Sequence, residues 1–205
     1  MFKAIVAAMA LCSIALPAKA ELRDYGARSV PDVMSEQQLD RDAREHWKSF
    51  TTGKSHFGAF HYNAKTRVSY WVTGLTSLSV AITITKTMCE QASRNKGDCV
   101  LVATLVPKGF PKGAQEATGL SRGQSAAVAD WKKDRAPGYA AFAVDGLGDH
   151  GWSTGHGDKA SAIDTAMLYC MSFGGETMAE SSGEFRKAYQ RHGLTECRLF
   201  RVEKR

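Results

Sequence analysis

After its first twenty residues the chain has no long hydrophobic run, which excludes a transmembrane helix in the rest of the sequence. It has no CxxC pair, the spacing that thiol oxidoreductases and many structural zinc sites use. No dense stripe of Lys and Arg marks it as a nucleic-acid binder. No P-loop follows a predicted strand. We therefore expect no membrane span, no nucleic-acid partner and no cofactor.

The first twenty residues, MFKAIVAAMALCSIALPAKA, have the pattern of a secretory signal peptide. Lys3 precedes an apolar segment over 4–16, and Ala18-Lys19-Ala20 forms a cleavage signature. The apolar segment is shorter than the roughly twenty residues that a bilayer crossing needs. A buried N-terminal helix is the alternative. We expect an exported protein of the bacterial periplasm or the extracellular space.

Removing this segment lowers the positive charge. The 27 basic residues less Lys3 and Lys19 leave 25 against 21 acidic residues, a net charge of about +4. A mildly basic surface favours weak contact with anionic envelope components. The remaining length suits one large domain or two small ones.

Four cysteines remain after the predicted cleavage: Cys89, Cys99, Cys170 and Cys197. An even number in an exported protein indicates disulfides, and four cysteines allow three pairings. An internal repeat favours one of them. Two segments match at an offset of 81, through the pairs Trp71/Trp152, Gly74/Gly155, Ala81/Ala162 and Cys89/Cys170, with Ala59-Phe60 and Ala141-Phe142 one residue out of step. The repeat predicts the bridges Cys89–Cys99 and Cys170–Cys197.

The repeat predicts an α+β fold with an antiparallel sheet or sheets, built from two (α)ββαβ units whose helices pack on one face. The predicted organisation is a first unit over 21–106, a Pro/Gly/Lys linker over 107–120, and a second unit over 121–205 with a helical insertion at 174–193.

Capping boxes predict where the helices of both units begin. Ser35 with Gln38, and Ser121 with Gln124, begin helices that run to about residues 50 and 134 and carry Trp47 and Trp131. Two unrelated amphipathic helices are the alternative to a repeat here. Ser181 with Glu184 predicts a third start, inside the insertion.

Residues 78–89 are ambiguous. Val80, Ile82 and Ile84 alternate with small polar residues, which alone favours a strand. The matching segment of the second unit is rich in alanine and follows Asp158, a plausible N-cap. We predict a helix for both segments.

These motifs resemble the small exported bacterial proteins of domain-of-unknown-function family 4189, over about residues 57–106 and 139–203. The carriers are Ala59-Phe60, Trp71, Gly74, Ala81, Cys89 and Cys99, and in the second unit Ala141-Phe142, Trp152, Gly155, Ala162, Cys170 and Cys197. The resemblance implies a disulfide-pinned α+β domain and no assigned activity. The β-branched first helix and the long second cysteine loop depart from the family pattern.

The best candidate metal ligands are Asp149, His150, His156 and Asp158, because two imidazoles and two carboxylates near one hairpin could hold Zn²⁺. Turn and cap residues in a glycine-rich loop are the alternative. The glycines of 146–151 lie in this predicted hairpin and not in a βαβ unit, so we predict no dinucleotide site.

Candidate binding residues are of two kinds. Trp71 and Trp152 are core residues or an exposed aromatic platform for a glycan. Arg186, Lys187 and Arg191 form a basic surface on the inserted helix.

Three functional hypotheses follow. The first is a non-enzymatic binding module for a protein or an envelope component. The second is a periplasmic inhibitor or immunity protein. The third is a metal-dependent hydrolase that uses the four candidate ligands. The sequence leaves the ligand and the oligomeric state open.

Overall fold

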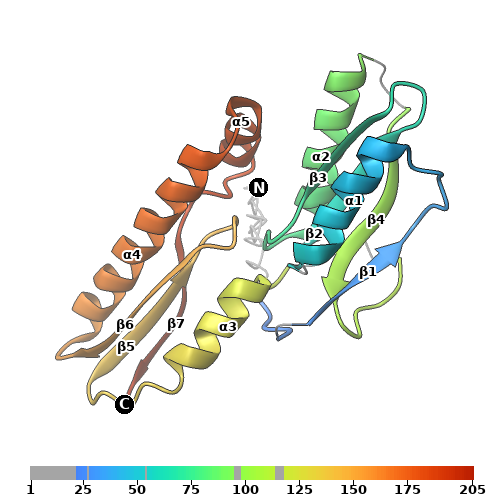
Figure 1. Ribbon diagram of the computed structural model, residues 1–205. Helices are drawn as coiled ribbons and strands as arrows, with labels where there is room; N and C mark the ends of the chain where they lie inside the picture. Colours follow the sequence, from blue (N-terminus) through green and yellow to red (C-terminus); the bar gives the residue numbers. More distant parts are fainter. Residues whose placement is uncertain (1–21, 27, 54, 95–97, 114–117) are drawn as a thin grey trace, which may run out of the picture.

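The computed structural model describes residues 22–26, 28–53, 55–94, 98–113 and 118–205. Two antiparallel sheets lie side by side, each with helices packed against it (Figure 1). This architecture confirms the predicted α+β class. The predicted signal peptide and part of the predicted linker lie outside the described residues. Of the helices that are described, none combines the length and the apolar character that a membrane crossing requires.

The first sheet has the strand order β1-β4-β2-β3, at Ser29–Val33, Val100–Pro107, Gly58–Asn63 and Val68–Val72. Strand β1 was not predicted from the sequence. Its two valines favour a strand, and Val30 lies opposite Val106 on β4. Pro31 is tolerated because β1 is an outer strand.

The second sheet has the strand order β6-β5-β7, at His150–His156, Tyr139–Val144 and Arg198–Lys204. Each sheet pairs a phenylalanine of an inner strand with a tryptophan of an outer strand, Phe60 with Trp71 and Phe142 with Trp152. The pairing on the other side of the inner strand shifts register directly after the same phenylalanine. The two halves therefore share one register pattern. Their descent from one duplicated unit stays a prediction.

Helices cover both faces of the first sheet, so the prediction of helices on one face was wrong. The two helices are α1 and α2, at Arg41–Gly53 and Leu78–Ser93. Successive strand residues point to opposite faces. On β2, Phe60 clusters with Phe50 of α1, whereas Ala59 clusters with Ile84 of α2. Every β2 residue is buried, because this strand has no polar face to leave in water.

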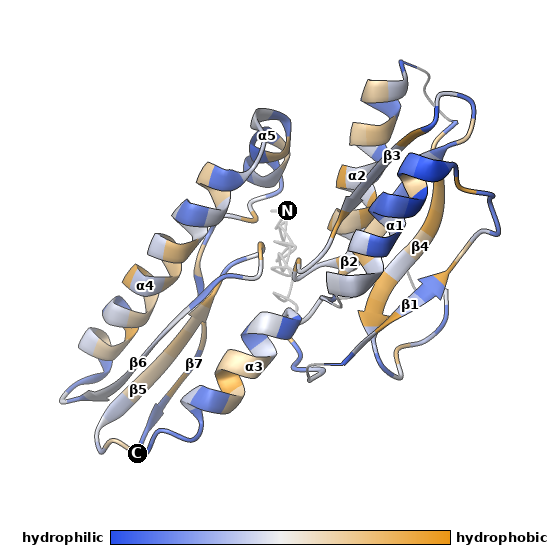
Figure 2. Cartoon of the chain, viewed as in Figure 1, coloured by the Kyte–Doolittle hydropathy of each residue, from blue (hydrophilic) through white to orange (hydrophobic). Residues whose placement is uncertain are grey.

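The second sheet is covered in the same way by α3 and α4, at Arg122–Trp131 and Lys159–Glu180. Phe142 of β5 packs against Trp131 of α3, with ring centroids 5.7 Å apart. The neighbouring Ala141 clusters with Ala166 of α4 on the other face. Figure 2 colours the inner strands β4 and β5 mostly hydrophobic, as strands buried on both faces require.

The ambiguous segment is helix α2, as predicted. Threonines are tolerated in it because the hydroxyls of Thr83, Thr85 and Thr87 donate to carbonyls four residues earlier. Ser77 caps the helix by accepting from the Val80 amide.

Two predicted helix starts need correction. Helix α1 begins at Arg41, because Asp40 and not Ser35 accepts a bond from the Ala43 amide, at 2.9 Å. The inserted helix α5, Gly183–Arg191, is capped by Ser182. Its neighbour Ser181 donates to a carbonyl at the end of α4. The predicted capping box of Ser121 and Gln124 at α3 is confirmed.

Two disulfides join Cys89 to Cys99 and Cys170 to Cys197, which confirms the predicted pairing. Each joins a helix to the start of the next strand, and the Cα atoms of each pair are 6.1 Å apart. The bridges therefore fix α2 to β4 and α4 to β7.

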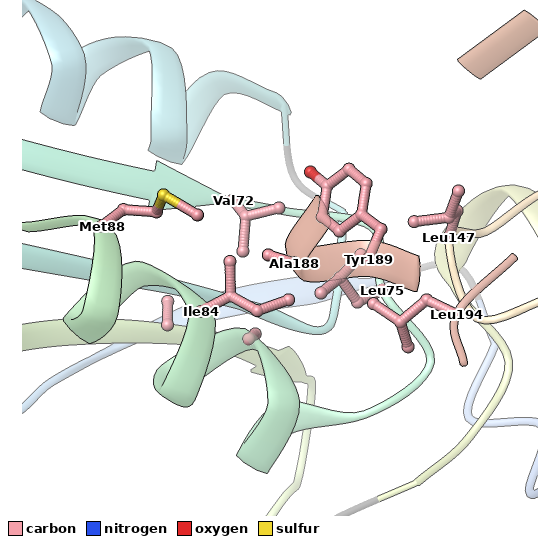
Figure 3. Close-up of a cluster of buried hydrophobic side chains, with 10 residues drawn as sticks. Val72, Leu75, Ile84, Met88, Leu147, Ala188, Tyr189 and Leu194 are labelled. Carbon is pink, nitrogen blue, oxygen red and sulfur yellow. The ribbon is translucent and has the colours of Figure 1, made fainter. Parts of the chain in front are cut away.

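The two halves meet in a shared hydrophobic cluster, in which α5 and the β5–β6 loop pack against α2 and β3. Figure 3 shows Tyr189 and Leu194 from the second half beside Leu75 and Ile84 from the first. Burial raises the pKa of Tyr189 to about 12. The Thr76 amide donates to the Gly146 carbonyl across this seam, at 3.1 Å. The relative position of the halves is thus held by a packed core.

Candidate functional site

The outer strands β3 and β6 have matching places in the two sheets, and a surface groove lies along each of them. The β3 groove has a volume of about 610 Å³ and the β6 groove about 520 Å³. Within the described residues, no strand pairs with the outer side of either strand. An outer strand edge presents unpaired backbone N–H and C=O groups. Trp71 lines the first groove and Trp152 the second.

One wall of the β3 groove is polar. It is formed by Asp42 and His46 from α1 and by Arg67, Ser69 and Trp71. The His46 Nδ1 and the Ser69 Oγ are hydrogen-bonded at 2.7 Å, which joins helix and strand across the groove. Alternate strand residues share a face, so these three residues of the hairpin lie on the α1 side.

The opposite wall of the β3 groove is apolar. It is formed by Val68 and Tyr70 on the other face of β3, Ala92 of α2 and Phe185 of α5. The rings of Tyr70 and Phe185 have centroids 6.1 Å apart. Because Phe185 belongs to the second half, the groove is complete only when both halves are docked.

The β6 groove is formed by the outer strand and one flank of α4. Its lining side chains include His150, Trp152, Thr154, His156, Thr165, Tyr169 and Phe173. The three large aromatic residues are prominently exposed, Trp152 by 37%, Tyr169 by 50% and Phe173 by 49%. This groove therefore carries a row of exposed aromatic side chains.

Helix α4 approaches β6 unusually closely, and glycine makes this possible. A Cβ atom on Gly151 would lie 2.3 Å from the Ala166 carbonyl oxygen and the Cys170 amide nitrogen. Ser153 donates from Oγ to the Ala162 carbonyl, at 2.7 Å. Strand and helix consequently form one rigid unit beneath the aromatic residues.

The imidazole of His150 is held on the sheet. Its ring stacks on Phe142, with centroids 5.6 Å apart and planes 2° from parallel. Burial lowers the pKa of His150, and the charge of Asp149 opposes this shift. The side chain serves as an aromatic packing group.

The predicted metal site is not formed. Asp149 and His150 lie at one end of β6, and His156 and Asp158 lie at the other, about 20 Å away at the rise of a strand. Asp158 is the N-cap of α4, where its carboxylate accepts from the Ser161 amide. The described residues contain no group of three or more His, Cys, Asp and Glu side chains placed to hold a metal. The extended strand of the hairpin therefore separates the four candidate ligands, although they are close in sequence.

Two short motifs in the second hairpin match a nucleophile motif and a dinucleotide-binding motif by spacing only. Residues Gly151–Gly155 fit G-x-S-x-G, a match that the sequence analysis missed. A nucleophile elbow needs a sharp strand-to-helix turn, whereas Ser153 is buried in the middle of β6. Residues 146–151 fit G-x-G-x-x-G but join β5 to β6 with no helix following. Both motifs are structural here.

The basic residues of α5 do not all line one cleft. Lys187 and Arg191 line a cleft of about 220 Å³ between α5 and α2, together with Glu184. Arg186 does not line it. The acidic neighbour reduces the positive character of this cleft.

A buried carboxyl group lies at the seam between the halves. The side chain of Asp145 accepts from the amides of Leu147 and Asp149 through Oδ1, whereas Oδ2 is buried without a hydrogen-bond partner. Burial, followed by the charge of Asp149, raises the pKa of Asp145 to about 7. No sequence pattern identified this residue as a buried carboxyl group.

Comparisons with known proteins give no match: no family model, no curated protein and no solved structure resembles the chain at a significant level. The two grooves are therefore the features of the molecule that indicate a function.

Proposed function

We propose that this protein is an exported, non-catalytic binding module and that the β3 groove holds an extended segment of a partner protein. The observation that carries this proposal is the combination of an unpaired strand edge with one polar and one apolar wall. The predicted signal peptide and the two disulfides support export. Membership of the exported family that the sequence resembles is part of the same proposal.

The edge of β3 supplies the affinity of such a complex. An added strand would pair with the free backbone groups of β3, a common mode of peptide recognition. Its side chains would alternate between the walls. One set would contact Tyr70 and Phe185, and the other would meet the charged Asp42 and Arg67. The partner segment is thus expected to alternate apolar and polar residues.

The test begins with selection of peptides from a displayed library on the purified, oxidised protein. Binding of a selected peptide is measured by fluorescence anisotropy. Phe185→Ala should weaken binding about tenfold, the usual effect of truncating an aromatic residue at the centre of an interface. Trp152→Ala is the matched control, since it removes an aromatic residue from the other groove, and should leave binding unchanged. Equal loss in both variants, or loss in neither, would contradict the proposal.

A further inference from the structure

Exposed apolar side chains are concentrated on the second half. Among the described residues, five of the nine exposed large hydrophobic side chains belong to β6 and α4, namely Trp152, Leu168, Tyr169, Met171 and Phe173. Of these, Trp152, Tyr169 and Phe173 line the β6 groove. Large exposed apolar surfaces mark contacts with other molecules. The β3 groove, which carries the proposed function, is elsewhere on the molecule.

Strand β6 lacks charged and proline protection along its outer edge, and its one irregularity is a register shift between Ser153 and His156, at its C-terminal end. Its sequence, HGWSTGH, contains no lysine and no proline, the residues that most often prevent edge-to-edge pairing. Two copies of such an edge can pair with each other in antiparallel orientation. This pairing is symmetric, as a contact between identical chains across a two-fold axis must be.

Helix α4 places a matching row of side chains beside that edge. Thr165, Tyr169 and Phe173 are four residues apart, so they follow one flank of the helix, and all three line the β6 groove. Glu176 and Glu180 continue the same flank toward the C-terminal end. Lys159 lies in the first turn, at the opposite end.

The charges on α4 are complementary to a second copy of the same helix. When two copies of α4 lie antiparallel, Lys159 of each comes to the level of Glu180 of the other. The midpoint between these residues falls at Tyr169 and Cys170. A Cβ on Gly151 of β6 would touch those two residues, so the same axis passes through the middle of the strand edge.

The aromatic side chains supply a large part of the area that a stable contact needs. Trp152, Tyr169 and Phe173 offer on the order of 300 Å² per copy. Standard interfaces bury roughly 800 Å² per partner, and in this arrangement the paired strands and the facing helices contribute the rest.

We propose that the β6–α4 surface is the contact between two copies of this chain, in which the β6 strands pair antiparallel and the α4 helices lie side by side. The result is one continuous sheet across the dimer, with Tyr169 and Phe173 of both copies buried at its centre. The β3 grooves lie on other strands and stay available to ligands.

The test is sedimentation equilibrium of the oxidised protein over roughly 1–100 µM, a range that resolves micromolar dissociation constants. The wild-type protein should sediment as a dimer at the upper end. Tyr169→Lys should raise the dissociation constant at least tenfold. Met171→Lys is the matched control, because Met171 lies about 160° around the same helix. Unchanged circular dichroism shows that each variant is folded.

A charge exchange tests the antiparallel arrangement. Lys159→Glu and Glu180→Lys should each weaken the dimer, and the double variant should recover it. A monomer at every concentration would overturn the proposal and leave the surface to a different partner. A dimer that tolerates Tyr169→Lys, or a double variant that is weaker than both single variants, would overturn it as well.

Discussion

The outer strands β3 and β6 begin from the same register pattern and end with different surfaces. In the first half, α1 continues beyond Trp47 and places Phe50 against Trp71, with ring centroids 6.4 Å apart. In the second half, α3 ends at Trp131, the counterpart of Trp47. Three residues after Trp131, where the first half has Phe50, the second half has Asp134. The Asp134 carboxylate accepts a hydrogen bond from the Thr154 hydroxyl.

This difference explains the exposure of the second tryptophan. Lacking a phenylalanine over its ring, Trp152 is 37% exposed, whereas Trp71 is partly covered. Helix α3 ends at Trp131, and a proline- and glycine-containing segment follows at 136–138, where a helix could not continue. Helix α3 therefore lacks the turn that covers the outer tryptophan in the first half, and β6 is left with an exposed apolar edge.

The buried turn residue shows the same contrast. Asn63 of the first hairpin accepts from the amides of Lys65 and Thr66, as Asp145 does from the amides of its own turn. Each residue keeps one buried polar atom without a partner. The first half uses a neutral amide where the second uses a carboxyl group.

Asp145→Asn, which copies the first half, should give the largest effect. Asp145 binds a proton up to about pH 7 in the folded protein but only to about pH 4 when unfolded. Its contribution to stability is therefore present below pH 4 and is lost as pH rises toward 7. The asparagine side chain does not titrate, so the Asp145→Asn variant does not lose this contribution to stability as pH rises. Its free energy of unfolding should improve relative to wild type by about 4 kcal/mol between pH 4 and pH 7, at about 1.4 kcal/mol per pH unit.

The measurement is urea denaturation of both proteins across this pH range. Asp149 is the acidic neighbour of Asp145, and Arg198 is a basic neighbour whose pKa the charge of Asp145 raises against the effect of burial. Burial lowers the pKa of His61 to about 4, so His61 destabilises the fold as pH falls from 6.5 to 4. This pH dependence is the same in the wild-type protein and in the variant, so it cancels when their free energies of unfolding are subtracted. If the free energies of unfolding of the two proteins change in parallel with pH, the Asp145 carboxyl group does not distinguish the two turns.

The two disulfides should also contribute differently to the free energy of unfolding, and this difference is smaller than the effect expected for Asp145→Asn. The Cys170–Cys197 bridge closes a longer loop, with a sequence separation of 27 against 10. In the chain-entropy model, replacing that pair by alanine costs about 3.6 kcal/mol, and replacing Cys89 and Cys99 costs about 2.8 kcal/mol. Urea denaturation of both double variants measures the difference. A larger loss from the shorter loop would mean that native packing, and not loop length, sets the contribution.

Spacing in the sequence was sufficient to predict the disulfides, the hairpins and the helical state of α2. These features depend on residues that are near in sequence or repeated at a fixed interval. The choice of Asp40 over Ser35 as the cap of α1 could not be predicted, since both residues are good caps. Strand β1 depends on a partner more than seventy residues away in the chain, Val30 opposite Val106.

The candidate site was predicted only in part. Both tryptophans were identified, but Tyr169, Phe173 and Phe185 looked like ordinary helix residues. Their exposure or their contact across the seam depends on tertiary packing. The four candidate metal ligands were close in sequence, yet an extended strand separates them.

The central claim is that the two halves share one register pattern but have different outer strand edges. The most direct test of this claim is amide hydrogen exchange of the wild-type protein at low and high concentration. The β3 and β6 amides are compared in one sample. Exchange in β6 should slow as concentration rises, because a second copy covers that edge, whereas exchange in β3 should stay constant. Equal behaviour of the two strands, slowed or unchanged, would contradict the account.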